Sequence, residues 1–135
     1  MKLSQVFYEI FESDAQHLDE IDSTQIHEID REIRLIDEQG ESTFISWCSE
    51  PVQYSVGTSK VSFFDEPIPV IQDMSNSGLW KALVGKDVAV SFVDKHHQVL
   101  EITNDDNDKV YCWTSAFDEE GEDTLFISPQ TPLTH

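Results

Sequence analysis

The alternation of apolar and polar residues in the C-terminal half is the feature that most constrains the fold of this chain. An alternation with a period of two is typical of β-strands that bury one face. In residues 87–92, the apolar side chains Val88, Val90 and Phe92 occupy every second position. Because the links between such segments are short and polar, we expect an antiparallel meander of four strands. The three further segments are QVLEIT (98–103), KVYCWT (109–114) and TLFIS (124–128).

The first segment of the chain has a pattern that fits two structures. Its apolar residues follow the i, i+3, i+4, i+7, i+8 spacing of an amphipathic helix, so we expect a short helix over 3–11. A strand is the second choice, because Val6, Tyr8 and Ile10 also alternate.

A hairpin is predicted around the turn EQGE (38–41), with strands near 31–37 and 42–48. Apolar and charged residues alternate in REIRLID, and STFISW is rich in strand-forming residues. The alternative is a helix over 24–39, because four isoleucines have helical spacing there and Gly40 could end it.

The middle of the chain predicts shorter elements. We expect short strands at 52–56 and 61–64 around Gly57, and an edge strand or loop at EPIPVIQD (66–73), where two prolines limit pairing. SNSGLWKALVGK (75–86) predicts one or two helical turns, because Ser77 can cap a helix start and Gly85 can end it. The side chains expected to face the core from these turns are Leu79, Trp80, Leu83 and Val84.

Together these patterns predict an α+β fold that is mainly antiparallel β. We expect a meander or partly open barrel with one or two short helices packed on it. A length of 135 residues with 39% hydrophobic residues suits one domain with its own core. Within this domain, 1–135, we expect a helical or mixed segment at 1–30, a β-rich core at 31–128 and a tail at 129–135.

The charge of the chain limits its partners. The net charge is −19, from 27 acidic and 8 basic residues, and the excess is spread along the sequence. Without a basic patch to bind phosphates, direct binding to nucleic acid or to an anionic membrane surface is disfavoured. A basic protein partner would instead be steered toward this chain. The alternative is that the charge serves only solubility.

The N-terminus lacks the features of a signal peptide, since it has neither an uninterrupted apolar run nor a small-residue cleavage site. No stretch approaches the length of a transmembrane helix. We therefore expect a cytoplasmic protein without membrane association. Cys48 and Cys112 should then be reduced, buried thiols, and a disulfide would require that their two strands face each other.

The segment NDDND (104–108) joins two predicted strands, and its residue types are those of a turn. It does not fit an EF-hand loop. Aligning Asn104, Asp106 and Asp108 with the first ligands places Lys109 where glycine is needed and Ser115 where the bidentate glutamate is needed. We therefore predict no metal site here.

The densest negative region lies at 101–124, which holds nine acids and one base. We predict that it binds a partner, and the alternative is a solvated rim. Trp113 would serve as an aromatic anchor if buried Cys112 turned it outward, although burial is favoured because tryptophan is highly buried on average. The predicted partner-binding residues are Asp105, Asp106, Asp108, Asp118, Glu119, Glu120, Glu122, Asp123 and Trp113.

Catalytic motifs are missing from the sequence. It contains no HExxH, no GxSxG and no glycine-rich phosphate loop. His96 and His97 are adjacent in a predicted turn without a cysteine pair nearby, and the only arginines, Arg31 and Arg34, can pair with acids across the sheet. We therefore predict no enzymatic activity and no cofactor.

In size, acidity and lack of catalytic motifs, the chain resembles the small bacterial immunity proteins that neutralise toxins. The resemblance implies a cytosolic single domain that binds one protein partner. An immunity protein against a basic nuclease would use carboxylates to occupy a phosphate-binding cleft. The alternatives are a β domain that binds a small ligand in a concave pocket and a structural subunit, as a monomer or a homodimer.

Overall fold

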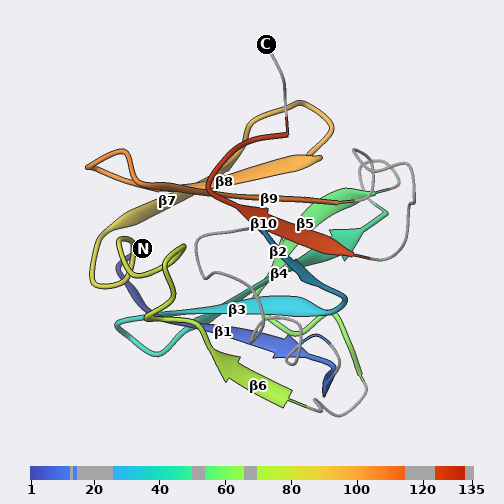
Figure 1. Cartoon of the computed structure of the whole chain (residues 1–135), viewed down its shortest axis with the longest axis horizontal. Helices are drawn as coiled ribbons and strands as arrows, with labels where there is room; N and C mark the ends of the chain where they lie inside the picture. The colour runs from blue at the N-terminus through green and yellow to red at the C-terminus, as the bar shows by residue number, and fades with distance from the viewer. Residues whose placement is uncertain (13, 15–25, 50–53, 66–69, 115–123, 133–135) are drawn as a thin grey trace.

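The computed structural model describes residues 1–12, 14, 26–49, 54–65, 70–114 and 124–132. They form two five-stranded antiparallel sheets (Figure 1). The strands of sheet 1 are β1 (Leu3–Ile10), β3 (Glu32–Asp37), β4 (Ser42–Cys48), β5 (Ser55–Ser59) and β6 (Val70–Asp73). The strands of sheet 2 are β2 (His27–Ile29), β7 (Val88–Phe92), β8 (Val99–Asn104), β9 (Lys109–Thr114) and β10 (Leu125–Ser128).

The predicted meander and hairpin are both confirmed. In sheet 2 the order is β2-β10-β9-β8-β7, so the four C-terminal strands lie side by side in chain order. In sheet 1 the order is β5-β4-β3-β1-β6, and β3 pairs with β4 as the hairpin requires. Gly40 lies in the hairpin turn with φ of 81°, a left-handed conformation that glycine adopts without strain.

The predicted N-terminal helix is wrong, because residues 3–10 form strand β1. This strand is internal to sheet 1, between β3 and β6. Tyr8, Glu9 and Ile10 are buried in succession, so both faces of β1 are covered near its end. A strand covered on both faces loses the simple alternation that marks a half-exposed strand, and its apolar residues can imitate helical spacing.

The expected helical turns at 75–86 do not form a regular helix, and the part of the chain that the structure describes contains almost no helix. The backbone there makes isolated turns, with Lys81 N bonded to Ser77 O and Val84 N bonded to Trp80 O. The predicted strand at 61–64 is also absent. The expected inward side chains Leu79, Trp80 and Leu83 are nevertheless buried, and Gly85 has the predicted left-handed φ, at 83°.

The two sheets share one apolar core. Sheet 1 contributes residues such as Val6 and Ile33, and sheet 2 contributes residues such as Leu100 and Ile102. Backbone hydrogen bonds join the sheets at two corners. At one, Leu3 N donates to Lys86 O at 3.0 Å, and at the other, Val56 N donates to His97 O at 2.7 Å. The sheets are therefore fixed to each other beyond their apolar contact.

A short polar chain crosses this core. Trp80 Nε1 donates to the Tyr8 hydroxyl at 2.8 Å, and the hydroxyl lies 2.7 Å from His27 Nδ1. Because the hydroxyl accepts from Trp80, its own proton is available for the His27 nitrogen. All three side chains are at most 1% exposed, and burial raises the pKa of Tyr8 well above its ordinary value. Tyr8 therefore stays neutral, and its hydroxyl links the Trp80 and His27 side chains.

Replacing Tyr8 with phenylalanine should lower the free energy of unfolding by about 1–3 kcal/mol, because the buried Trp80 N–H and His27 nitrogen lose their partner. Urea denaturation followed by tryptophan fluorescence would measure the loss. The matched control is Tyr111→Phe on the half-buried outer side of β9, where the hydroxyl bonds to the partly exposed Glu101, so it should cost about 1 kcal/mol or less. Equal losses of unfolding free energy in the two variants would show that the buried hydrogen bonds of Tyr8 have no special importance for stability.

Candidate functional site

The acidic turn that joins β8 to β9 is organised by Asn104. Its Oδ1 accepts hydrogen bonds from the backbone N–H groups of Asp106 (2.9 Å) and Asp108 (3.0 Å). Its Nδ2 donates to Asp108 Oδ2 (3.0 Å) and to the backbone oxygen of Ala82 (3.1 Å). The side-chain amide thus uses both donors and accepts two bonds. It ties the turn to the 77–84 segment, which is distant in sequence.

The turn presents its carboxylates to solvent. Asp105, Asp106 and Asp108 are all exposed, whereas Asn104 is only 7% exposed. Asn107 has φ of 64°, a left-handed conformation that asparagine tolerates better than most residues. The negative groups are therefore held by a buried amide and a defined backbone.

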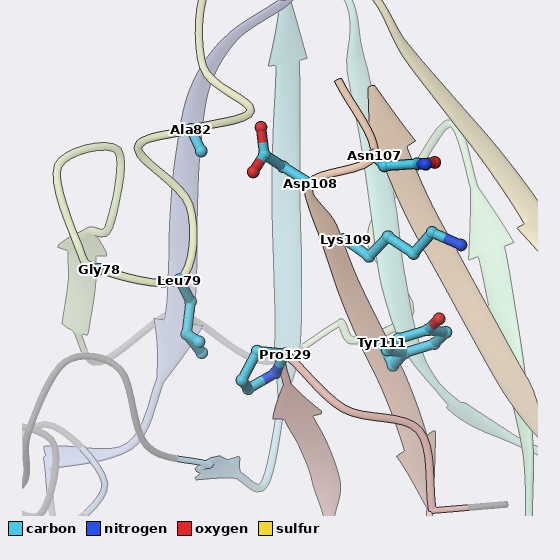
Figure 2. A pocket seen from close by; sticks show the side chains of 8 residues that line it. All are labelled: Gly78, Leu79, Ala82, Asn107, Asp108, Lys109, Tyr111 and Pro129. Atoms are coloured by element: carbon cyan, nitrogen blue, oxygen red, sulfur yellow. The ribbon is translucent and has the colours of Figure 1, made fainter. Parts of the chain in front are cut away.

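A cleft of about 450 Å³ lies between this turn and the 78–82 segment. Figure 2 shows Leu79 and Ala82 on one side and residues 107–109 on the other, with the Asp108 carboxylate turned toward Ala82. Apolar atoms of Leu79, Pro129 and Tyr111 also line the cleft. The cleft thus combines an apolar wall with a carboxylate at its rim.

One cation lines the same cleft, and a carboxylate lies close to it. Lys109 Nζ lies 3.6 Å from Glu101 Oε2, across the β8–β9 pair. Burial and then the hydrogen bond and charge of Glu101 raise the pKa of Tyr111, so this phenol stays neutral. Because Glu101 offsets the charge of Lys109, Asp108 sets the sign of the charge at the rim.

The other predicted site residues are placed differently or lie outside the described residues. Trp113 is 8% exposed and stacks on Phe126, with ring centroids 5.9 Å apart, so it does not offer an exposed anchor. Its burial agrees with the favoured expectation for this tryptophan. The predicted residues outside the described part of the chain are Asp118, Glu119, Glu120, Glu122 and Asp123.

The cysteines match the sequence expectation in part. Both are free thiols, but only Cys112 is buried, while Cys48 is partly exposed. Burial raises the pKa of the Cys112 thiol, which keeps it protonated and unreactive.

Sequence reasoning missed two components of this site. The role of Asn104 has a local signal, because asparagine at the first position of a turn commonly bonds to the backbone that follows. The opposite wall of the cleft, with Leu79 and Ala82, has no such signal. It reaches the turn only through the folding of segments about twenty residues apart in sequence.

Among the described residues, no group of three or more His, Cys, Asp or Glu side chains is placed to hold a metal ion. None of the helical structure described is long and apolar enough to span a membrane. The chain matches no protein-family model, and no similar chain was found among curated proteins or solved structures.

Replacing Asn104 with alanine should destabilise the protein by about 1–3 kcal/mol, because Ala82 O and two turn N–H groups lose their partner. Amide exchange of Asp106 and Asp108 should also become faster. Denaturation curves and hydrogen-exchange NMR would measure both effects. The control Asn107→Gly keeps these bonds and suits the left-handed φ of 64°, so it should preserve stability and protection. Unchanged amide protection in the alanine variant would show that Asn104 does not organise the turn.

Proposed function

We propose that this chain is an acidic cytoplasmic binding protein that docks a basic protein partner, in the manner of an immunity protein that neutralises a nuclease toxin. The docking surface is the acidic turn 104–108 together with the cleft beside it. The observation that carries the proposal is the exposure of three carboxylates on a turn that a buried asparagine holds against an apolar cleft.

The cleft has the chemistry that a lysine or arginine side chain needs. Such side chains have an apolar stem and a cationic end, and they bury the stem where apolar surface is available. Leu79 and Pro129 can cover the stem, while Asp108 meets the cation at the rim. Because the turn is already ordered by its own hydrogen bonds, little conformational entropy is lost when it binds.

The charge of the whole chain supports the same proposal. A net charge of −19 attracts a basic protein over several ångströms and accelerates encounter at low salt. A nuclease has a basic cleft for phosphates, and a carboxylate-rich turn can occupy it. We assign no catalytic role, cofactor or direct nucleic-acid contact to the chain, and we propose that it acts as a monomer or homodimer.

The alternative functions have less support. In the described structure, side chains of both sheets fill the space between them, which counts against a small ligand held inside the sheet sandwich. The cleft itself could accept a small cationic ligand, and its charge would select that ligand by the same contacts. A purely structural role gives no reason for an ordered acidic turn beside a cleft.

The triple change D105N/D106N/D108N should weaken binding of the partner by about tenfold or more, with a smaller salt dependence, because the attraction at the docking surface is lost. The partner is first captured on the immobilised chain from lysate of the source organism. Its affinity is then measured by calorimetry at two salt concentrations.

The control for this variant is E38Q/E41Q/D65N, which also removes three negative charges, but from exposed positions outside the docking surface. It should change affinity only slightly. Equal weakening by the two triple variants would mean that net charge alone acts, and it would contradict a defined docking surface. Charge reversal of Asp118, Glu119 and Glu122 then tests whether these acids belong to the same surface.

A further inference from the structure

Two glutamates lie directly opposite each other in the middle of sheet 1. Glu9 on β1 and Glu32 on β3 are register partners in the antiparallel pair. Directly opposed residues project from the same face of a sheet. Their neighbours Tyr8, Ile10 and Ile33 belong to the core between the sheets, so the glutamate pair lies on the face that is turned away from sheet 2.

Both glutamates are withdrawn from water on this face. Glu9 is 1% exposed and Glu32 is fully buried. The segment 60–65, which follows β5, contacts Glu32 through two hydrogen bonds. Ser62 Oγ donates to Glu32 Oε2 at 2.5 Å, and Phe63 N donates to Glu32 Oε1 at 3.0 Å. Both oxygens of Glu32 therefore act as acceptors, as an ionised carboxylate does.

Glu9 has a different environment. Its Oε1 lies 3.7 Å from Arg34 Nη1, while the Nε of Arg34 is engaged with Ser42 Oγ at 2.8 Å. Its Oε2 is buried and meets no hydrogen-bond donor among the described residues. A buried ionised oxygen without a donor is costly, whereas a protonated oxygen can donate to a neighbouring carboxylate.

We propose that Glu9 and Glu32 form a proton-binding site, in which Glu9 keeps one proton, shares it with Glu32 through a hydrogen bond and thereby holds the 60–65 segment against the sheet. The proton removes the repulsion between two adjacent carboxylates. It also leaves Glu32 ionised, so that Glu32 accepts from Ser62 and Phe63 at full strength. This site is separate from the acidic turn of the proposed function.

The electrostatics of the pair support this arrangement. Burial contributes most to a raised pKa of Glu9, followed by the charge of Glu32. Arg34 and Arg31 act in the opposite direction with smaller effects. From β6, the residue facing Glu9 is Ile71, which carries no charge. The charged groups that act on Glu9 from the described elements are thus one carboxylate and two guanidiniums.

The sign of the pH dependence follows from the raised pKa of Glu9. The folded state binds this proton more tightly than the unfolded chain does. The resulting stability is fully present below the ordinary glutamate pKa of 4.5 and is lost as pH rises through the raised value. Above that value, two ionised carboxylates face each other, and repulsion displaces Glu32 from Ser62 and Phe63.

Loosening of the 60–65 segment would uncover Cys48. A β-carbon built on Gly57 would lie 3.0 Å from Cys48 Sγ and 3.3 Å from the Phe63 ring, so the thiol and the ring both lie close to the same side of this glycine. Cys48 is partly exposed and Cys112 is fully buried. The rate at which a thiol reagent modifies Cys48 therefore reports the position of Phe63, and Cys112 is an internal reference.

Glu9→Gln tests the proposal, because glutamine stays neutral at every pH and keeps an N–H donor for Glu32. Modification rates of Cys48 are compared between wild type and this variant from acidic to alkaline pH. The same thiol and the same reagent are used for both proteins, so the ratio of the two rates isolates the effect of Glu9. The wild-type rate divided by the Glu9→Gln rate should stay near one at low pH and rise several-fold at high pH. A constant ratio would overturn the proposal.

A second variant and a direct titration complete the test. Glu32→Gln replaces one of the two carboxylate acceptors of Ser62 and Phe63 with an amide nitrogen, so it should speed Cys48 modification at low pH, where wild type holds the segment. If Glu32→Gln behaved as wild type, Glu32 would not hold the segment. In ¹³C-glutamate-labelled wild type, the Glu9 carboxyl should titrate with a midpoint above 4.5, and a midpoint at or below 4.5 would exclude the shared proton even if neither variant folded.

Discussion

The hydrogen-bonded chain from Trp80 through Tyr8 to His27 is the interaction on which the relative placement of the two sheets depends. Tyr8 belongs to sheet 1, His27 belongs to sheet 2, and Trp80 comes from the segment that connects them in sequence. Apolar burial supplies most of the driving force for folding, but it is not directional. Buried polar groups must find their partners, and they do so in one arrangement of the sheets. The Trp80–Tyr8–His27 hydrogen bonds therefore specify how the sheets stack, while the surrounding apolar side chains stabilise the stack.

An acidic chain has to separate its carboxylates from this core, and it does so in two ways. Most described acids are exposed, where water solvates them, and those of the 104–108 turn are held in place by Asn104. Glu9 and Glu32 are instead buried on the outer face of sheet 1, close to two arginines. A solvated carboxylate remains available for a cationic partner, whereas a buried pair responds to the proton. The proposed binding surface and the proposed proton site thus use one residue type in opposite environments.

Local patterns predicted those parts of the fold in which short polar turns separate successive strands. The C-terminal meander and the 31–48 hairpin have clear alternation or turn residues, and both form as expected. Strand β1 was only the second choice at its position, because residues on both of its faces are buried near its end and its apolar residues also fit helical spacing. The acidic turn was visible in its composition, but the cleft wall at Leu79 and the pairing of Glu9 with Glu32 depend on tertiary placement and register. Among 27 acids, no sequence feature distinguishes those two.

We propose above that the acidic turn 104–108 and the cleft beside it form one defined site for a cationic side chain. The most direct test is ¹⁵N NMR of the isolated chain during titration with a short arginine-containing peptide, beside a peptide of equal charge built from diaminopropionic acid, whose stem is too short for the cleft. The account predicts saturable shifts for the arginine peptide that concentrate at 78–82 and 104–111, and weaker shifts for the short-stemmed peptide. Small, unsaturated shifts spread over all acidic surfaces, equal for both peptides, would contradict it.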